Sequence, residues 1–206
     1  NFSYEAAKDA FNESLRKLDL DYVDLYLLHQ PFGDIFGAWR ALEELYKEGK
    51  IKAIGVSNFK PDQLANLAAF NEVTPAVNQI ELHVFNQKED EQAYMLSKGV
   101  QTASWGAFAE GQFDVFNNPV LKEIAEKYSK TTEQVMLRWQ LQRGIVSLSK
   151  SANPERVRQN FDIFDFELSA EDMDKIATLN TNTTVFSDHH EAKTVELLAS
   201  FVGKSF

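Results

Sequence analysis

Residues able to bind or activate a small molecule stand at the far ends of short apolar runs in this sequence. These residues are His29, Ser57 with Asn58, Gln79, Trp105, and Lys150 with Ser151. Each apolar run predicts a buried strand, and a helical pattern comes next. Polar side chains at strand ends, followed by helices, are typical of the active sites of parallel barrels, which are built from βα loops. The sequence therefore predicts a site assembled from several strand ends.

The apolar runs are short, rich in β-branched and aliphatic residues, and bounded by turn signals, as buried strands are. They cover residues 22–28, 51–56, 76–80, 100–104 and 145–149. Helix caps stand between these runs or after the last of them, such as Gly49 after one helical pattern, Asn153 before Pro154, and Ser169 with Asp172 at capping-box spacing. This alternation predicts an α/β fold of parallel strands, joined by right-handed crossovers and covered on both faces. The first two runs should then be buried on both faces.

A helix is expected at the start of the chain, and the sequence leaves the structure of its end open. Ser3 can cap a run in which apolar residues share one face, namely Ala7, Ala10, Phe11, Leu15 and Leu18. Near the other end, Val195, Leu198 and Phe201 could line an amphipathic helix. His189 and His190 precede that segment and are expected to be solvated.

Composition narrows the class of protein. The steady alternation has no linker rich in Pro, Gly or Ser, which favours a single domain over residues 1–206, and 44% hydrophobic residues can fill a core. A formal net charge of -10 argues against a nucleic-acid surface. Zero cysteines exclude disulfides and thiol nucleophiles and fit a reducing cytoplasm. With neither a signal peptide nor a membrane-spanning run, a cytoplasmic protein without a membrane partner is predicted.

Six segments of the chain carry recognisable motifs in a fixed order. They are DLYLLHQPFGD at 24–34, GKIKAIGVSNF at 49–59, AVNQIELH at 76–83, ASWGAFAEG at 103–111, and the stretches 149–169 and 171–180. Together they resemble consecutive blocks of the aldo-keto reductase family. The resemblance implies a (β/α)8 TIM barrel that reduces aldehydes and ketones with NADPH. Here it implies a partial barrel of five parallel strands, with residues 179–206 as a C-terminal tail and three strands absent before the opening helix, as in an incomplete record of a longer enzyme.

The resemblance assigns one catalytic residue to this chain. The family uses a tyrosine proton donor, a lysine and an aspartate that adjust its pKa, and a histidine that orients the carbonyl. The histidine corresponds to His29, and the other three belong to the absent part, so the chain alone is expected to be inactive. Independently, a histidine at the C-terminal end of a barrel strand can stabilise charge growing on a carbonyl oxygen. On residue type alone, the His29 side chain could equally well form a hydrogen bond with the backbone of a turn.

The resemblance also assigns contacts to the nicotinamide end of the cofactor. Ser57, Asn58 and Gln79 match residues that hydrogen-bond the carboxamide, a group that needs both donors and acceptors. Trp105 matches an aromatic residue that stacks on the nicotinamide ring. Taken alone, Ser57-Asn58 would be a cap or turn, and Trp105 a core residue.

A cluster of positive and polar residues is expected to hold the adenosine 2′-phosphate. Two cations and a hydroxyl, Lys150, Arg156 and Ser151, lead into a capped helix and make an anion site. By resemblance they clamp the phosphate, with Gln159 and Asn160 near the adenine. This favours NADPH over NADH. The sequence has no G-x-G-x-x-G fingerprint, so a Rossmann fold is rejected.

The pair Glu81 and His83 raises the question of a metal. A carboxylate and an imidazole can ligate a metal or exchange protons, but no third ligand is apparent and the family uses none. A structural role is therefore preferred, and no metal is predicted.

Two functions from different classes remain open. The first is NADPH-dependent reduction of a small carbonyl substrate, as part of a longer aldo-keto reductase. The alternative is a non-catalytic NADP-binding module that acts as a redox-sensing or interaction subunit. An open barrel also exposes unpaired edges on its terminal strands, so self-association is expected.

Overall fold

The computed structural model describes residues 3–186, 188 and 190–201. Its strands are β1 (Val23–Leu28), β2 (Ile51–Ser57), β3 (Val77–Glu81), β4 (Gln101–Trp105) and β5 (Val146–Ser147). Its α-helices are α1 (Tyr4–Leu18), α2 (Ile35–Lys47), α3 (Pro61–Ala69), α4 (Glu89–Ser97), α5 (Pro119–Tyr128), α6 (Thr132–Gln142), α7 (Pro154–Phe161), α8 (Ala170–Ala177) and α9 (Ala192–Ala199). Two short 3₁₀ helices, η1 (Ala109–Gly111) and η2 (Val115–Asn117), follow β4.

The strands form one five-stranded sheet in chain order, β1-β2-β3-β4-β5. The pairs β1–β2, β2–β3 and β4–β5 are parallel. Each parallel connection contains a helix, as crossovers between parallel strands require. The predicted α/β fold of five parallel strands with flanking helices is confirmed.

Strand β5 is shorter than the predicted run 145–149. Val146 and Ser147 pair with β4, and the Leu148 N–H still reaches the carbonyl of Ser104 at 3.0 Å. Beyond this point the chain turns, because the Ser151 hydroxyl accepts from the Asn153 N–H at 3.2 Å and Asn153 caps α7. Local side-chain hydrogen bonds of this kind compete with strand pairing.

The described residues group into two compact units. The first comprises the described residues of Asn1–Gln79, Ala93–Gln101 and Ser187–Phe206. The second comprises Ile80–Gln92 and Thr102–Phe186. Whether the chain forms the single domain predicted from its sequence stays a prediction.

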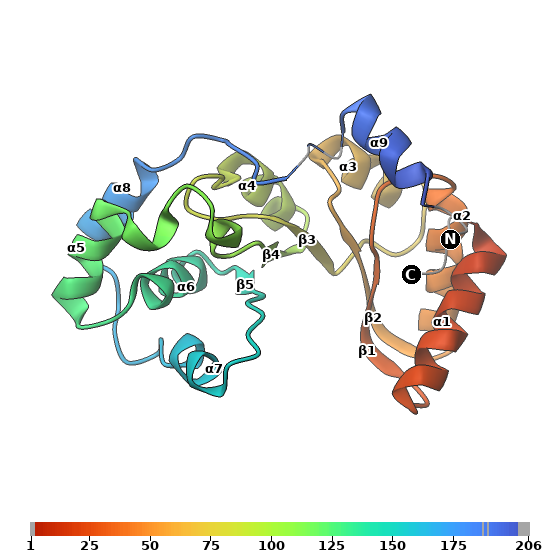
Figure 1. The fold of residues 1–206 in the computed structure, drawn as a ribbon. Helices are drawn as coiled ribbons and strands as arrows, with labels where there is room; N and C mark the ends of the chain where they lie inside the picture. Colours follow the sequence, from red (N-terminus) through yellow and green to blue (C-terminus); the bar gives the residue numbers. More distant parts are fainter. Residues whose placement is uncertain (1–2, 187, 189, 202–206) are drawn as a thin grey trace. The chain divides into compact units, whose positions relative to one another are not determined.

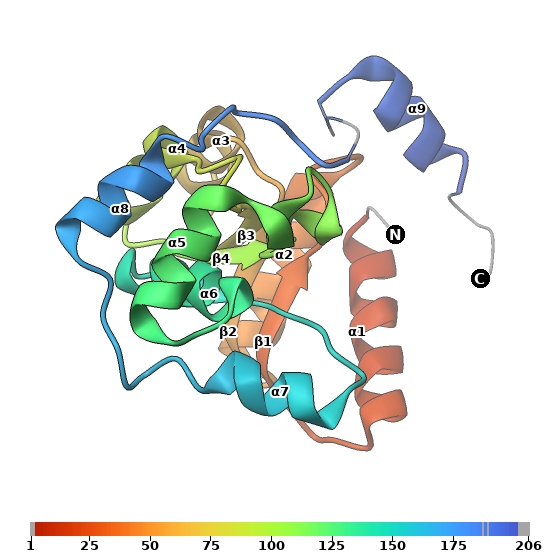
Figure 2. The same cartoon turned by 60° about the vertical axis from the view of Figure 1, so that its left-hand side comes forward.

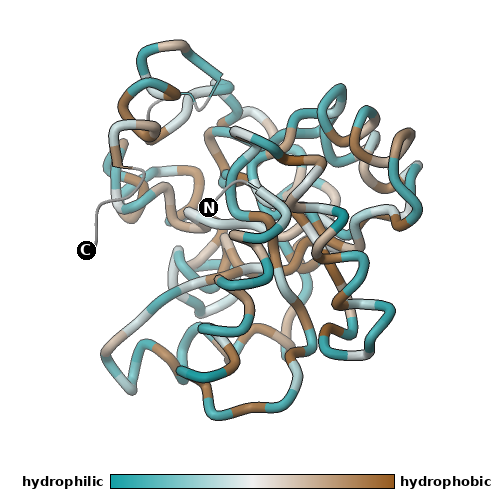
Figure 3. The backbone as a smooth tube through the Cα atoms, turned by 90° about the vertical axis from the view of Figure 1, so that its right-hand side faces the viewer, coloured by the Kyte–Doolittle hydropathy of each residue, from teal (hydrophilic) through white to brown (hydrophobic). Residues whose placement is uncertain are grey.

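In the first unit, α1 and α2 pack beside β1 and β2 (Figures 1 and 2). Phe11 of α1 is fully buried and meets the Tyr26 ring edge-on at 5.2 Å. The indole N–H of Trp39 donates to the carbonyl of Val73 at 3.1 Å, which ties α2 to the loop before β3. Apolar and polar residues alternate along these helices, as the sequence periodicity predicts (Figure 3).

The prediction that residues 22–28 are buried on both faces is wrong for β1. Leu25 is 43% exposed, while Tyr26, on the opposite side of the pleat, packs on α1. Successive side chains of a strand point to opposite faces, so one layer of helices covers one face. By contrast, most of β2 is buried, as predicted.

In the second unit, hydrogen bonds join α5 and α8 around Asp172. The buried Asp172 carboxylate accepts from the Lys127 ammonium at 2.8 Å and the Tyr128 hydroxyl at 2.6 Å, and it completes a capping box with Ser169. Burial alone would raise the pKa of Asp172, but the hydrogen bonds of Lys127, Tyr128 and Ser169 hold it well below its usual range. The capping box predicted from the spacing is confirmed.

Sequence reasoning missed α5, although its start carries a strong signal. Asn118 caps the helix and Pro119 is its first residue, the same Asn-Pro pair that correctly marked α7. The predicted caps Ser3 and Asn153 are confirmed, and Gly49 has the positive φ of 75° expected after a helix.

The amphipathic helix considered for the end of the chain is present as α9, with little of its surface buried. Val195 and Leu198 are half-buried, whereas Phe201, just beyond the helix, is 38% exposed. Of the two tail histidines, His189 lies outside the described residues, and His190 is half-buried rather than fully exposed.

Among the described residues, no helix combines the length and the apolar character needed to cross a membrane.

Gly55 in β2 predicts a test of the sheet that carries the site. A Cβ at Gly55 would lie 2.6 Å from a methyl carbon of Leu27 and 2.8 Å from the carbonyl oxygen of Val77. We expect Gly55→Ala to lower the free energy of unfolding by about 1–3 kcal/mol, the usual cost of overpacking. Urea denaturation followed by circular dichroism measures it.

Lys52→Ala serves as the control on the same strand. The Lys52 ammonium pairs with Asp24 at 2.8 Å, but both side chains are more than half exposed. Exposed pairs contribute about 0–1 kcal/mol. Equal stability of Gly55→Ala and the unchanged chain would mean that β1 and β3 can move apart at no cost.

Candidate cofactor and carbonyl site

The end of β2 is fixed to β3 by the backbone carbonyl of Gln79. Ser57 stands opposite Gln79 in the parallel register. The Ser57 hydroxyl donates to the Gln79 carbonyl at 2.8 Å, and the Asn58 N–H donates to the same oxygen at 3.0 Å. One acceptor thus locks two of the predicted cofactor residues to the third.

The Asn58 side chain extends this cluster to the end of β1. Its Nδ2 donates to the Ser57 hydroxyl at 3.2 Å and to the backbone carbonyl of His29 at 3.3 Å. Asn58 adopts the left-handed region with φ 63°, which asparagine tolerates better than most residues. The structure therefore brings His29, Ser57, Asn58 and Gln79 together within the first unit. His29 and Ser57 lie at the ends of their strands as predicted, whereas Gln79 lies inside β3 rather than at its end.

Two polar side chains of this cluster remain available to a ligand. Ser57 and Asn58 are buried, Gln79 is half-buried and His29 is exposed. In the described part of the chain, neither the Gln79 carboxamide nor the His29 imidazole has a hydrogen-bond partner. A free amide supplies both a donor and an acceptor, which is what a carboxamide group requires. The fixed backbone and the free side chains suit recognition of a small polar ligand.

The predicted anion site lies in the second unit at the start of α7. The Asn153 side chain accepts from the Glu155 N–H at 2.9 Å and from the Arg156 N–H at 3.4 Å, so it occupies the helix N-terminus itself. Lys150 and Arg156 are exposed, and within the described ranges neither has an ion-pair partner. Arg158 on the same helix instead pairs with Glu155 at 3.6 Å. Two cations therefore stand free beside this helix in an acidic chain.

The two residues expected near the adenine are placed differently from each other. Gln159 is exposed, and its backbone carbonyl accepts from the Gln134 side chain at 3.2 Å. The amide of Asn160 is half-buried and donates to the Ser149 hydroxyl at 3.3 Å. Asn160 therefore fastens α7 to the segment that carries Lys150.

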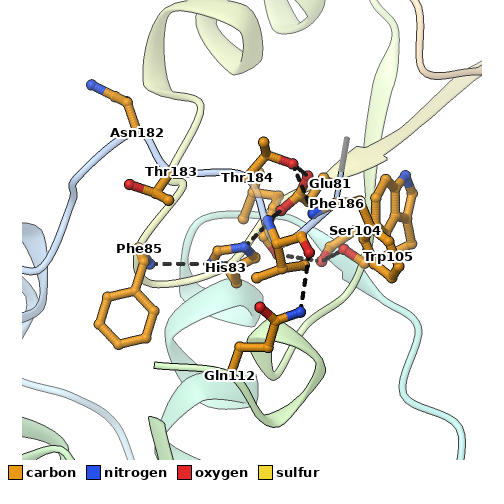
Figure 4. A network of polar contacts seen from close by, with 12 residues as sticks. Glu81, His83, Phe85, Ser104, Trp105, Gln112, Asn182, Thr183, Thr184 and Phe186 are labelled. Atoms are coloured by element: carbon orange, nitrogen blue, oxygen red, sulfur yellow. Dashed lines mark hydrogen bonds and ion pairs between the residues drawn. The ribbon is translucent and has the colours of Figure 1, made fainter. Parts of the chain in front are cut away.

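Trp105 ends β4 in the second unit and is partly exposed rather than core. The preceding Ser104 is fully buried, and its hydroxyl donates to the Leu82 carbonyl at 2.7 Å. The ring of Phe186 lies 5.4 Å from the indole at a tilt of 60° (Figure 4). Sequence reasoning missed Phe186, because a lone aromatic residue in a polar tail carries no periodic signal.

Glu81 and His83 belong to a buried hydrogen-bonded network (Figure 4). His83 is fully buried, and its Nε2 lies 2.9 Å from a Glu81 carboxylate oxygen. Burial acts to raise the pKa of Glu81, but hydrogen bonds from His83, Thr184 and Val185 outweigh it and leave that pKa below its usual value. Among the residues described, no cluster of three or more His, Cys, Asp or Glu side chains could hold a metal.

Comparison with known proteins identifies the class to which this fold and these residues belong. The model of the aldo/keto reductase family matches residues 1–181. The chain is 48% identical over 183 residues to the glyoxal reductase of Bacillus subtilis (strain 168), covering 88% of this chain and 66% of the relative. It is 42% identical to the methylglyoxal reductase of Escherichia coli (strain K12), covering 87% and 66%. The chain belongs to the aldo/keto reductase family and spans 66% of the length of these two relatives.

Solved structures agree on the fold. An aldo-keto reductase from a Medee basin deep-sea metagenome library superposes with a TM-score of 0.90 at 41% identity, covering 93% of this chain and 72% of that one. A Bombyx mori aldo-keto reductase solved in complex with NADP superposes with a TM-score of 0.85 at 32% identity, covering 90% and 66%. The expected family and the partial-barrel fold are confirmed. The roles of the individual site residues stay predictions.

Asn58 offers a test of how the first unit holds its cluster. Asn58→Gly and Asn58→Ala both remove the hydrogen bonds to His29 and Ser57. Alanine is also strained in the left-handed conformation of this position, whereas glycine adopts it freely. We expect both variants to be less stable than the unchanged chain, and Asn58→Ala to be less stable than Asn58→Gly by about 1 kcal/mol. Urea denaturation measures the difference, and equal stabilities would show that the backbone relaxes when the side chain is gone.

Proposed function

We propose that this chain forms part of an NADPH-dependent reductase that converts a small aldehyde or ketone to an alcohol. The observation that carries the proposal is the pair of free cations, Lys150 and Arg156, beside the capped start of α7. A phosphate would gain charge-assisted hydrogen bonds there without breaking an existing ion pair. Membership of the family and the NADP complex of a Bombyx mori relative support the choice of cofactor.

Each unit, taken by itself, offers groups that fit one part of the cofactor. In this proposal, Ser57, Asn58 and Gln79 of the first unit are the partners of the carboxamide. Trp105 of the second unit is the stacking partner of the nicotinamide ring, and Lys150, Ser151 and Arg156 of the same unit bind the adenosine phosphate. The fit rests on the unpaired Gln79 amide and on the unpaired cations. When bound, NADPH supplies the hydride. The relatives named for glyoxal and methylglyoxal suggest small reactive aldehydes as substrates.

His29 has the role of an electrostatic stabiliser in this reaction. Its imidazole is exposed at the end of β1, and its backbone is held by Asn58. An N–H of the ring can donate to the carbonyl oxygen of a substrate and stabilise the negative charge that grows there. By the family resemblance, the proton comes from a tyrosine, and the resemblance assigns that role to no residue of this sequence.

The location of the reaction is a further part of the proposal. The complete lack of cysteine fits the reducing cytoplasm. A non-catalytic NADP-binding module would share the phosphate site and differ in turnover, so turnover is measured separately from binding.

The phosphate site predicts the cofactor preference. We expect Lys150→Ala combined with Arg156→Ala to abolish the preference for NADPH over NADH, since each charge-assisted hydrogen bond contributes roughly 1.5–3 kcal/mol. Fluorescence titration with each nucleotide measures it. Arg158→Ala is the matched control, because Arg158 lies on the same helix but pairs with Glu155. Equal affinity of the unchanged chain for both nucleotides would refute the phosphate site.

The 206-residue chain is predicted to show no appreciable turnover by itself. A positioned general acid commonly contributes about 10²–10⁴-fold, and the resemblance assigns the family's acid to no residue of this chain. NADPH oxidation with glyoxal measures turnover, and the Bacillus subtilis glyoxal reductase is the positive control. Turnover comparable to that control would show that another group in this chain donates the proton.

A further inference from the structure

The segment 181–186 is fastened at its far end to the Glu81 carboxylate (Figure 4). Glu81 is the last residue of β3 and is 8% exposed. It accepts a hydrogen bond from the Val185 N–H at 2.7 Å and another from the Thr184 hydroxyl. A carboxylate thus holds two consecutive residues of an otherwise irregular segment.

The start of the same segment is bound to Phe85, which lies four residues after Glu81 in the sequence. The backbone carbonyl of Phe85 accepts from the Thr181 N–H at 3.0 Å and from the Thr183 N–H at 3.3 Å. The Gln112 side chain adds a third attachment, because its Nε2 donates to the Val185 carbonyl at 3.0 Å. Hydrogen bonds at both ends leave the segment little freedom to move away from the end of β3.

The histidine of the network orients the Glu81 carboxylate. The Phe85 N–H donates to Nδ1 of His83 at 3.3 Å, so Nδ1 accepts and Nε2 carries the hydrogen that faces Glu81 at 2.9 Å. Burying a carboxylate is costly unless hydrogen bonds replace its water. The hydrogen bonds from Thr184, Val185 and His83 replace that water. Two of these three donors belong to the segment, so the burial of Glu81 depends on the segment being in place.

The residue that the segment delivers is Phe186. The Thr184 hydroxyl donates to Glu81 and also accepts from the Phe186 N–H at 3.2 Å, so one side chain links the carboxylate to the backbone of Phe186. The Phe186 ring is 49% exposed and lies against Trp105. Tilted aromatic pairs at this separation attract each other, which restrains the plane of the indole.

We propose that Glu81 is a positioning residue: by holding Thr184 and Val185 it seats Phe186 on Trp105 and fixes the indole against which the nicotinamide stacks. The cofactor part of this inference rests on the proposed function. The seating of Phe186 on Trp105 does not depend on it.

The first arm of the test needs no cofactor. Thr184→Val keeps the shape of the side chain and removes both bonds of the hydroxyl, whereas the control Thr183→Val removes a bond to the Thr181 carbonyl at 3.3 Å. Trp39 and Trp139 are at most 2% exposed, so acrylamide quenching of tryptophan fluorescence reports on Trp105. We expect stronger quenching in Thr184→Val and an unchanged signal in Thr183→Val. Unchanged quenching in both would overturn the seating of Phe186.

The second arm measures NADPH affinity in a double-mutant cycle of Thr184→Val and Phe186→Ala. We expect each single variant to bind about tenfold more weakly, which corresponds to ~1.4 kcal/mol. The double variant should lose no more than Phe186→Ala does, because Thr184 acts through Phe186. If the substitutions instead caused a general loss of structure, the unfolding midpoint would fall, and the affinity losses of the two single variants would add in the double variant. Additive losses, or full affinity in Thr184→Val, would overturn the positioning role.

The two arms separate this inference from the proposed function. If the unchanged chain fails to bind NADPH, the proposed function and the cofactor part of the inference fall together. The quenching arm then still decides whether Glu81 and Thr184 seat Phe186 on Trp105. If the chain binds NADPH and both variants behave like it, the proposed function stands and the positioning role is refuted.

Discussion

The backbone carbonyl of Gln79 is the acceptor on which the first part of the site depends. It accepts hydrogen bonds from both the Ser57 hydroxyl and the Asn58 N–H, and these bonds fix the end of β2 relative to β3. From there the Asn58 side chain reaches the carbonyl of His29 and fixes the end of β1. A parallel sheet places the C-terminal ends of its strands along one edge, so a single shared acceptor can set the positions of groups far apart in sequence.

Electrostatics in this chain separates pairs that hold the fold from charges that are free to bind. Asp172 and Lys127 join two helices, and Arg158 is satisfied within α7 by Glu155. Lys150 and Arg156 have no such partner in the part of the chain that the structure describes. Two unpaired cations at the start of one helix create a local positive potential, although the chain as a whole has a net charge of -10. This is the charge that the proposed phosphate site requires.

The second unit shows how a polar tail can act on an aromatic residue of a sheet. Glu81 and Phe85 hold the two ends of the segment 181–186, and Phe186 follows directly from those attachments. The hydrogen bonds fix the backbone, and the ring contact transmits that order to Trp105. Buried polar networks that are fully satisfied specify one arrangement of the groups around them.

Local signals in the sequence determined most of the elements. The runs of apolar residues located the strands, and Ser3, Asn153 and Ser169 located helix starts, because caps and periodicity depend on near neighbours in the chain. The same reasoning placed His29 and Ser57 correctly at strand ends, whereas Gln79 lies inside β3. The family resemblance assigned the roles of all three residues. The missed start of α5 was a local signal too, carried by Asn118 and Pro119.

Tertiary structure decided what depends on contacts between distant residues. The exposure of Leu25, the early end of β5 and the bonds that Glu81 makes with Thr184 all arise from which segments pack together. Residue type gives no warning of such contacts, since one carboxylate can ligate, catalyse or hold a tail. Its partners settle the matter, and those partners are chosen by long-range packing and by the need of each buried polar group for a hydrogen bond.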